Sequence, residues 1–117
     1  MLVVDDHPEV VALVGTVLEA HGHQVDRAHS VPAARELLAS DTDWELLLTD
    51  VKLDGATGLE LVAEVQRRVP APAVVLMSGM LDAEASDLVA RGAAVFLQKP
   101  FALAELTGAV DAALGAR

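Results

Sequence analysis

The sequence predicts a single α/β domain in which five strand–helix units form a doubly wound, three-layer sandwich around a parallel five-stranded sheet. Short apolar runs alternate along the whole chain with longer stretches whose apolar residues recur every three or four positions. These are the patterns of buried strands and of amphipathic helices. Strands that alternate with helices form mostly parallel sheets, and helices cover both faces of such a sheet.

The first half of the chain contains three of the predicted strands. Residues 2–4 form a short apolar run, and a helix is predicted over residues 8–20, with a proline in its first turn. Residues 24–28 are a weak strand, and a second helix begins near Ser30 and continues to about residue 39. Residues 44–49 form the strongest strand, which ends at an aspartate.

The second half repeats this alternation. Glycines mark a loop after the third strand, and two prolines end the helix that follows it. The predicted elements are, in order, a helix over 58–68, a strand over 73–77, a helix over 82–91, a strand over 94–98 and a helix over 103–114. No linker or repeat interrupts them, so we expect one domain over residues 1–117.

Composition excludes several classes of function. Eight basic and 18 acidic residues give a net charge of 8 − 18 = −10, which disfavours direct binding to nucleic acid or to an anionic membrane surface. The absence of cysteine excludes disulfides, thiolate metal sites and cysteine nucleophiles. No apolar run approaches the roughly 18 residues of a membrane span, and no signal peptide is evident. We therefore expect a cytoplasmic domain.

Polar side chains follow four of the five predicted strands, at the edge where ligands bind in open α/β sheets. These residues are Asp5 and Asp6, Asp50, Ser78 and Lys99. Taken singly, each is explained by turn chemistry or by a helix cap. Together, three carboxylates, a hydroxyl and an ammonium at one edge indicate a functional site.

The predicted cluster of carboxylates requires a cation, because close like charges repel one another. Ligands that are all oxygen favour Mg²⁺, with Mn²⁺ as the alternative, over Zn²⁺. A hard cation beside an ammonium and a hydroxyl is suited to phosphoryl transfer, in which one carboxylate can act as the nucleophile.

The sequence resembles the receiver domains of bacterial two-component systems, of the kind found in chemotaxis regulators. The motifs that carry the resemblance span nearly the whole chain; they are Leu2-Val3-Val4-Asp5-Asp6, Leu48-Thr49-Asp50 with Gly58 eight positions on, Met77-Ser78-Gly79 and Phe96-Leu97-Gln98-Lys99-Pro100-Phe101. The resemblance implies a flavodoxin-like sheet with strand order 2-1-3-4-5. The third and fourth motifs are closest to those of receivers attached to hybrid sensor histidine kinases.

The resemblance also implies a role for each residue of the site. Asp50 is the implied phosphoacceptor, and Asp5, Asp6 and Asp50 hold Mg²⁺ together with the backbone carbonyl of Lys52. Lys99 pairs with the phosphoryl group. Two further residues form the implied switch: Ser78 moves toward the phosphoryl group, and the aromatic ring of Phe96 changes rotamer. The Lys99–Pro100 peptide bond is expected to be cis.

A receiver of this kind is a signalling module, which assists its own aspartyl phosphorylation and dephosphorylation, rather than an enzyme with a separate substrate. Its phosphodonor is a histidine kinase or a histidine phosphotransfer domain. An output partner, which the sequence does not identify, would be contacted through the surface of the fourth helix, fifth strand and fifth helix.

The sequence disfavours two alternative functions. A Mg²⁺-dependent phosphatase with an aspartyl intermediate usually has a second acid two positions after the nucleophile, where this chain has Lys52. A scaffold that has lost phosphorylation is disfavoured because the acidic, hydroxyl and ammonium residues are all present.

One departure from the family is Leu53-Asp54, where Met-Pro is usual. His7 could touch a bound metal, but a solvated residue of the first helical turn is the simpler interpretation.

Overall fold

A computed structural model describes residues 1–40, 42–80 and 82–115. Its main sheet has five parallel strands in the order β2-β1-β3-β6-β7. These strands are β1 (Leu2–Val4), β2 (Asp26–Ala28), β3 (Leu46–Asp50), β6 (Ala73–Ser78) and β7 (Val95–Gln98). In chain order they are the first to fifth strands of the sheet, so the predicted order 2-1-3-4-5 is confirmed.

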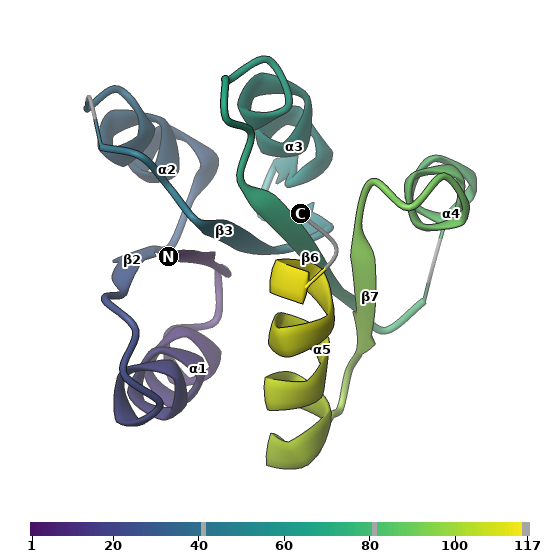
Figure 1. Cartoon of the computed structure of the whole chain (residues 1–117). Helices are drawn as coiled ribbons and strands as arrows, with labels where there is room; N and C mark the ends of the chain where they lie inside the picture. The colour runs from purple at the N-terminus through teal and green to yellow at the C-terminus, as the bar shows by residue number, and fades with distance from the viewer. Residues whose placement is uncertain (41, 81, 116–117) are drawn as a thin grey trace.

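Four of the helices in the described residues connect strands of this sheet, a fifth follows its last strand, and together they cover both faces (Figure 1). They are α1 (Pro8–Ala20), α2 (Val31–Leu38), α3 (Leu59–Val65), α4 (Ala83–Ala90) and α5 (Leu103–Gly115). Helices α1 and α5 pack on one face, and α2, α3 and α4 pack on the other. The three-layer α/β sandwich predicted from the alternating pattern is therefore confirmed. None of these helices combines the length and the apolar character that a membrane span requires.

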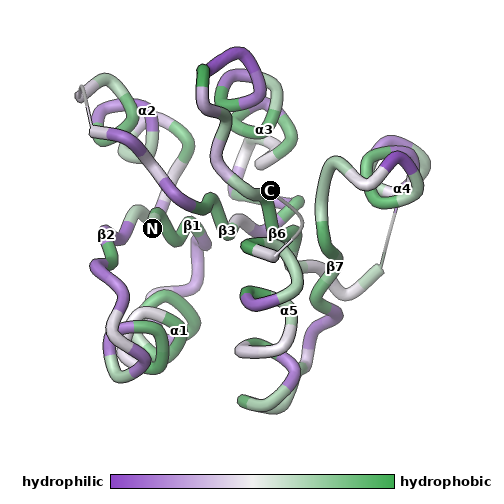
Figure 2. The backbone as a smooth tube through the Cα atoms, in the orientation of Figure 1, coloured by the Kyte–Doolittle hydropathy of each residue, from purple (hydrophilic) through white to green (hydrophobic). Residues whose placement is uncertain are grey.

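The core consists of two apolar layers, one on each side of the sheet. Figure 2 shows the hydrophobic residues concentrated on central strands such as β6, with hydrophilic residues on the outer sides of the helices. Val3 and Leu48 face the α1–α5 layer, whereas Val4 and Leu47 face the α2–α4 layer. This alternation is the period of two of a strand that is buried on both faces.

Local sequence signals set the ends of several helices. The Ser30 hydroxyl accepts a hydrogen bond from Ala33 N at 3.2 Å and caps α2. Asp82 caps α4 in the same way, by accepting from Ala85 N at 2.8 Å. Such caps satisfy backbone N–H groups that have no partner within the helix.

Apart from shifts of one or two residues at strand ends, such as β2 beginning at Asp26, two segments differ from the sequence-based expectation. The third helix ends at Val65, not at Arg68, because residues 67 and 68 donate to carbonyls three positions back, in a tightened final turn. The loop predicted after Asp50 contains a small antiparallel hairpin of β4 (Lys52–Leu53) and β5 (Ala56–Thr57). Gly55 in its turn has a φ of +71°, which glycine adopts without a steric penalty.

Candidate functional site

Strand register brings three of the predicted side chains to one side of the sheet edge. Asp5 follows Val3 by two positions and Asp50 follows Leu48 by two, so both carboxylates extend the α1–α5 face. Lys99 follows Leu97 by two, and its N–H continues the β6–β7 ladder by donating to Ser78 O at 2.8 Å. Residues far apart in the sequence therefore converge at the carboxyl ends of β1, β3 and β7.

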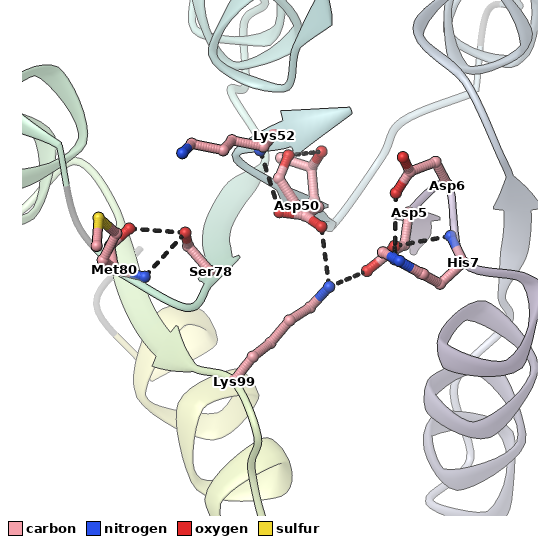
Figure 3. A network of polar contacts seen from close by, with 9 residues as sticks. Asp5, Asp6, His7, Asp50, Lys52, Ser78, Met80 and Lys99 are labelled. Carbon is pink, nitrogen blue, oxygen red and sulfur yellow. Dashed lines mark hydrogen bonds and ion pairs between the residues drawn. The ribbon is translucent and has the colours of Figure 1, made fainter. Parts of the chain in front are cut away.

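The Lys99 ammonium bridges the two buried carboxylates (Figure 3). Its Nζ donates to Asp5 Oδ2 at 2.6 Å and to Asp50 Oδ2 at 2.9 Å. The Asp5 side chain is fully buried and that of Asp50 is 9% exposed. Buried carboxylates of this kind require compensation by positive charge or by hydrogen bonds, and Lys99 supplies both.

These contacts change the proton affinity of both partners. Burial raises the pKa of Asp5, but hydrogen bonds from Lys99 and His7 outweigh burial, and the pKa lies below its ordinary value. For the Lys99 ammonium, burial acts in the opposite direction and lowers the pKa. Its hydrogen bonds and charge interactions with Asp5 and Asp50 outweigh burial, so the pKa of Lys99 lies above its ordinary value. Both residues are therefore charged at neutral pH.

Asp6 and His7 complete the acidic side of the cluster. His7 N donates to Asp5 Oδ1 at 2.9 Å, and the His7 ring nitrogen Nδ1 lies 3.0 Å from the same oxygen. The hydrogen bond with Asp5 raises the pKa of His7. Asp6 Oδ1 is buried and accepts no hydrogen bond among the described residues, although His7 Nδ1 lies 3.2 Å away.

This arrangement fits a hard divalent cation. Ligand atoms from Asp5, Asp6, His7 and Asp50 all lie within 4.8 Å of one another. Three carboxyl groups lie around the single Lys99 ammonium, and Asp6 Oδ1 is an oxygen that still has an unused acceptor position among the described residues. Carboxylate oxygens are ligands that Mg²⁺ and Mn²⁺ prefer.

The loop after Asp50 holds the carboxylate from its other side. Lys52 N donates to Asp50 Oδ1 at 3.1 Å, whereas the Lys52 side chain is exposed and extends away from Lys99 (Figure 3). Gly58, which precedes α3, lies directly against the end of β3. A Cβ atom at Gly58 would overlap the Asp50 carbonyl oxygen, so this close approach requires glycine.

Ser78 lies at the same edge, but its hydroxyl is directed away from Asp50 (Figure 3). It donates to Met80 O at 2.7 Å and accepts from Met80 N at 3.3 Å. Phe96 is half-buried and pairs with Leu76, which packs in the layer of α2, α3 and α4. Ser78 and Phe96 therefore share the face of the sheet that carries α4.

An open cleft of about 480 Å³ gives access to the site; Asp6, Asp50, Ser78 and Lys99 are among its lining residues. The Lys99–Pro100 peptide bond is cis, as predicted.

Three contacts at this site have no clear signal in the sequence. They are those of the His7 ring with two carboxylates, of the Lys52 amide with Asp50, and of the Met80 backbone with Ser78. Of the three, the sequence suggests only that His7 could touch a bound metal; its side chain is 58% exposed and also contacts Asp5 and Asp6.

Comparison with known proteins agrees with this geometry. Residues 1–111 match the family model described as the response regulator receiver domain. The response regulator protein PilR of Pseudomonas aeruginosa is 38% identical over 99% of this chain, and the transcriptional regulatory protein FixJ of Azorhizobium caulinodans is 37% identical over 97%. This chain spans 26% and 54% of their respective lengths.

A solved structure has the same fold over its whole length. The crystal structure of the receiver domain of NtrX from Brucella abortus superposes with a TM-score of 0.83, at 30% identity, over 99% of this chain and 98% of the other. The finer resemblance to receivers of hybrid kinases stays a prediction. The family match, the relatives and the acidic edge lead to one conclusion: the chain belongs to the response regulator receiver domains, the phosphoaccepting signalling modules of two-component systems.

Proposed function

We propose that Asp50 is the phosphoacceptor of this receiver and that its donor is the phosphohistidine of a histidine kinase or histidine phosphotransfer domain. The observation that supports this most directly is the contact of Asp50 with Lys99 Nζ at 2.9 Å beside the open cleft. The Asp50 carboxylate is thus oriented by Lys99 and lies at a cleft that a donor can enter. We also propose that residues 1–117 act as one receiver unit.

In the proposed step, a carboxylate oxygen of Asp50 attacks the phosphorus of the phosphohistidine. The new P–O bond forms as the P–N bond breaks, and the electron pair leaves with the imidazole nitrogen, which then takes up a proton from water. The Lys99 ammonium and the Lys52 N–H, both already on the Asp50 carboxylate, are suited to bind the incoming phosphoryl oxygens. The module in this way assists its own phosphorylation. The same groups would assist dephosphorylation, in which water attacks the phosphorus, the bond between phosphorus and the Asp50 oxygen breaks, and inorganic phosphate and the carboxylate are released.

Asp5, Asp6 and Asp50, with the backbone carbonyl of Lys52, would hold Mg²⁺, or Mn²⁺ as the alternative. The bound cation would neutralise negative charge on the phosphoryl oxygens. The buried Asp6 Oδ1, which accepts no hydrogen bond from the described residues, supports this assignment. Asp5, which Lys99 and His7 already hold, would also keep the ammonium in position.

Ser78 and Phe96 are the proposed switch. The Ser78 hydroxyl would exchange its contact with Met80 O for one with the phosphoryl group, and the change would reach Phe96 on the same face of the sheet. The surface of α4, β7 and α5 would then present the altered state to an output partner. The name of the relative FixJ, a transcriptional regulatory protein, makes a transcriptional output the natural partner to test.

The test is the intact mass of the protein after incubation with acetyl phosphate and Mg²⁺. We expect the parent to gain the mass of one phosphoryl group and Asp50→Asn to gain none. Asp54→Asn is the matched control, since Asp54 lines the same cleft but is exposed, and it should gain mass like the parent. A gain in Asp50→Asn equal to that of the parent would exclude Asp50 as the acceptor.

A further inference from the structure

We propose that the Thr57 hydroxyl is a positioning group for the phosphoacceptor: it aims the Lys52 N–H at Asp50. This inference rests on the proposed function of Asp50, which it deepens. Thr57 is half-buried at the end of β5, and nothing in its sequence context marks it as functional. Its role follows from three hydrogen bonds around one peptide group.

The peptide group between Val51 and Lys52 is held at both ends. Its carbonyl oxygen, Val51 O, accepts from Thr57 Oγ1 at 3.0 Å and from Gly58 N at 2.9 Å. Its N–H, on Lys52, donates to Asp50 Oδ1 at 3.1 Å. Because a peptide group is planar, fixing the direction of the C=O also fixes the direction of the N–H. Thr57 therefore acts on Asp50 through this peptide, without touching the carboxylate.

The direction of the Thr57 hydroxyl proton is also determined. Leu59 N donates to Thr57 Oγ1 at 3.2 Å, so the oxygen serves as an acceptor on that side. The single hydroxyl proton is then free to point to Val51 O. Thr57 thus joins the first turn of α3 to the loop after Asp50. It accepts a hydrogen bond from Leu59 N and donates one to Val51 O.

The consequence for phosphorylation is electrostatic as well as geometric. Hydrogen bonds to a carbonyl polarise its peptide group, which makes the N–H at the other end a stronger donor. A preformed N–H donor is of most value where negative charge accumulates, as on a phosphoryl oxygen bound to Asp50. Gly58 N also holds Val51 O, so removal of the hydroxyl should weaken this donor without abolishing it.

The experiment compares the parent with Thr57→Val and Thr57→Ser, and with Thr107→Val as control. Thr107 lies on α5, and among the residues that the structure describes it donates only to carbonyls of its own helix, Leu103 O and Ala104 O. One readout is the amide proton of Lys52 in metal-free ¹⁵N–¹H NMR spectra, by chemical shift and by hydrogen exchange. The other is the initial rate of mass gain with acetyl phosphate and Mg²⁺.

In Thr57→Val we expect the Lys52 amide resonance to move upfield and its exchange to quicken relative to core amides. The phosphorylation rate should fall about two- to threefold, the low end of what one ordinary hydrogen bond contributes, because Gly58 N still holds Val51 O. Thr57→Ser should restore both readouts, and Thr107→Val should leave both at the parent's values. A uniform change at all amides, or an unchanged Lys52 resonance, would overturn the inference. If the parent itself gains no mass, the proposed function fails, and the Lys52 resonance still decides the role of Thr57.

Discussion

Lys99 Nζ lies 2.9 Å from Asp50 Oδ2, although 49 residues separate the two along the chain. The same ammonium lies 2.6 Å from Asp5 Oδ2. Lys99 therefore has one function that its contacts show, compensation of the charge of two buried carboxylates, and one that we propose, a position beside the phosphoacceptor oxygen. The first function can be measured without any phosphodonor.

Replacement of Lys99 by methionine should destabilise the fold. It leaves the fully buried Asp5 carboxylate without its counter-charge. Loss of one partner of a buried ion pair costs about 3–5 kcal/mol, and the 21% exposure of Lys99 reduces this to about 1–3 kcal/mol in the free energy of unfolding. Urea denaturation at neutral pH measures the difference. Lys52→Met, at an exposed side chain, should stay within about 0.5 kcal/mol of the parent; an equal loss in both variants would contradict the bridging role.

The dependence of stability on pH should reveal the same bridge. The folded state lowers the pKa of Asp5 below its usual 3.8, so Asp5 contributes stability above this pH and loses the contribution as pH falls through the lower, folded-state pKa. The folded state also raises the pKa of Lys99 above the usual 10.5. The contribution of Lys99 to stability is therefore present below pH 10.5 and is lost as pH rises through the higher, folded-state pKa. In Lys99→Met, the free energy of unfolding should change less steeply at both extremes. Urea titrations across the two ranges test this, and slopes identical to the parent's would refute it.

Asp50→Asn should raise stability in the absence of divalent cations. Three carboxylates share one ammonium, so the variant removes a like-charge repulsion, and a gain of about 1 kcal/mol in the free energy of unfolding is expected. Added Mg²⁺ should reverse the order, because it stabilises the parent by binding and the variant much less. Thermal melts with and without Mg²⁺ measure both effects. Asp54→Asn is the charge-matched control. If Asp50→Asn is no more stable than the parent without metal, the repulsion among the three carboxylates is already compensated.

The sequence predicted those parts of the site that depend on strand ends and on the period of two. Asp5, Asp50 and Lys99 each follow a short apolar run, so their place at one edge could be inferred from the order of strands and helices. The direction of the Ser78 hydroxyl could not be inferred, because its rotamer depends on a bond to the Met80 backbone that no residue type encodes.

Backbone donors and short elements were also beyond sequence reasoning. The Lys52 N–H that holds Asp50 belongs to a group that every residue except proline carries, so no pattern marks it. The hairpin of β4 and β5 has strands of two residues, too short to show a period. The end of α3 at Val65 depends on a tightened turn before the prolines, which the apolar spacing does not reveal.

Gly58→Ala should be one of the most destabilising small substitutions in the chain, since its Cβ would overlap the Asp50 carbonyl oxygen and lie 2.6 Å from Thr49 Oγ1. The first of these atoms is backbone, so the end of β3 must shift, at a cost of about 1–3 kcal/mol in the free energy of unfolding. Gly108→Ala is the matched control: it lies within α5, a Cβ there has nothing within 4 Å, and the variant should gain about 0.5–1 kcal/mol. Urea denaturation of the two variants should therefore give changes of opposite sign. A gain in both would mean that the loop can move away from Asp50 without cost, and would remove the steric reason for glycine beside Asp50.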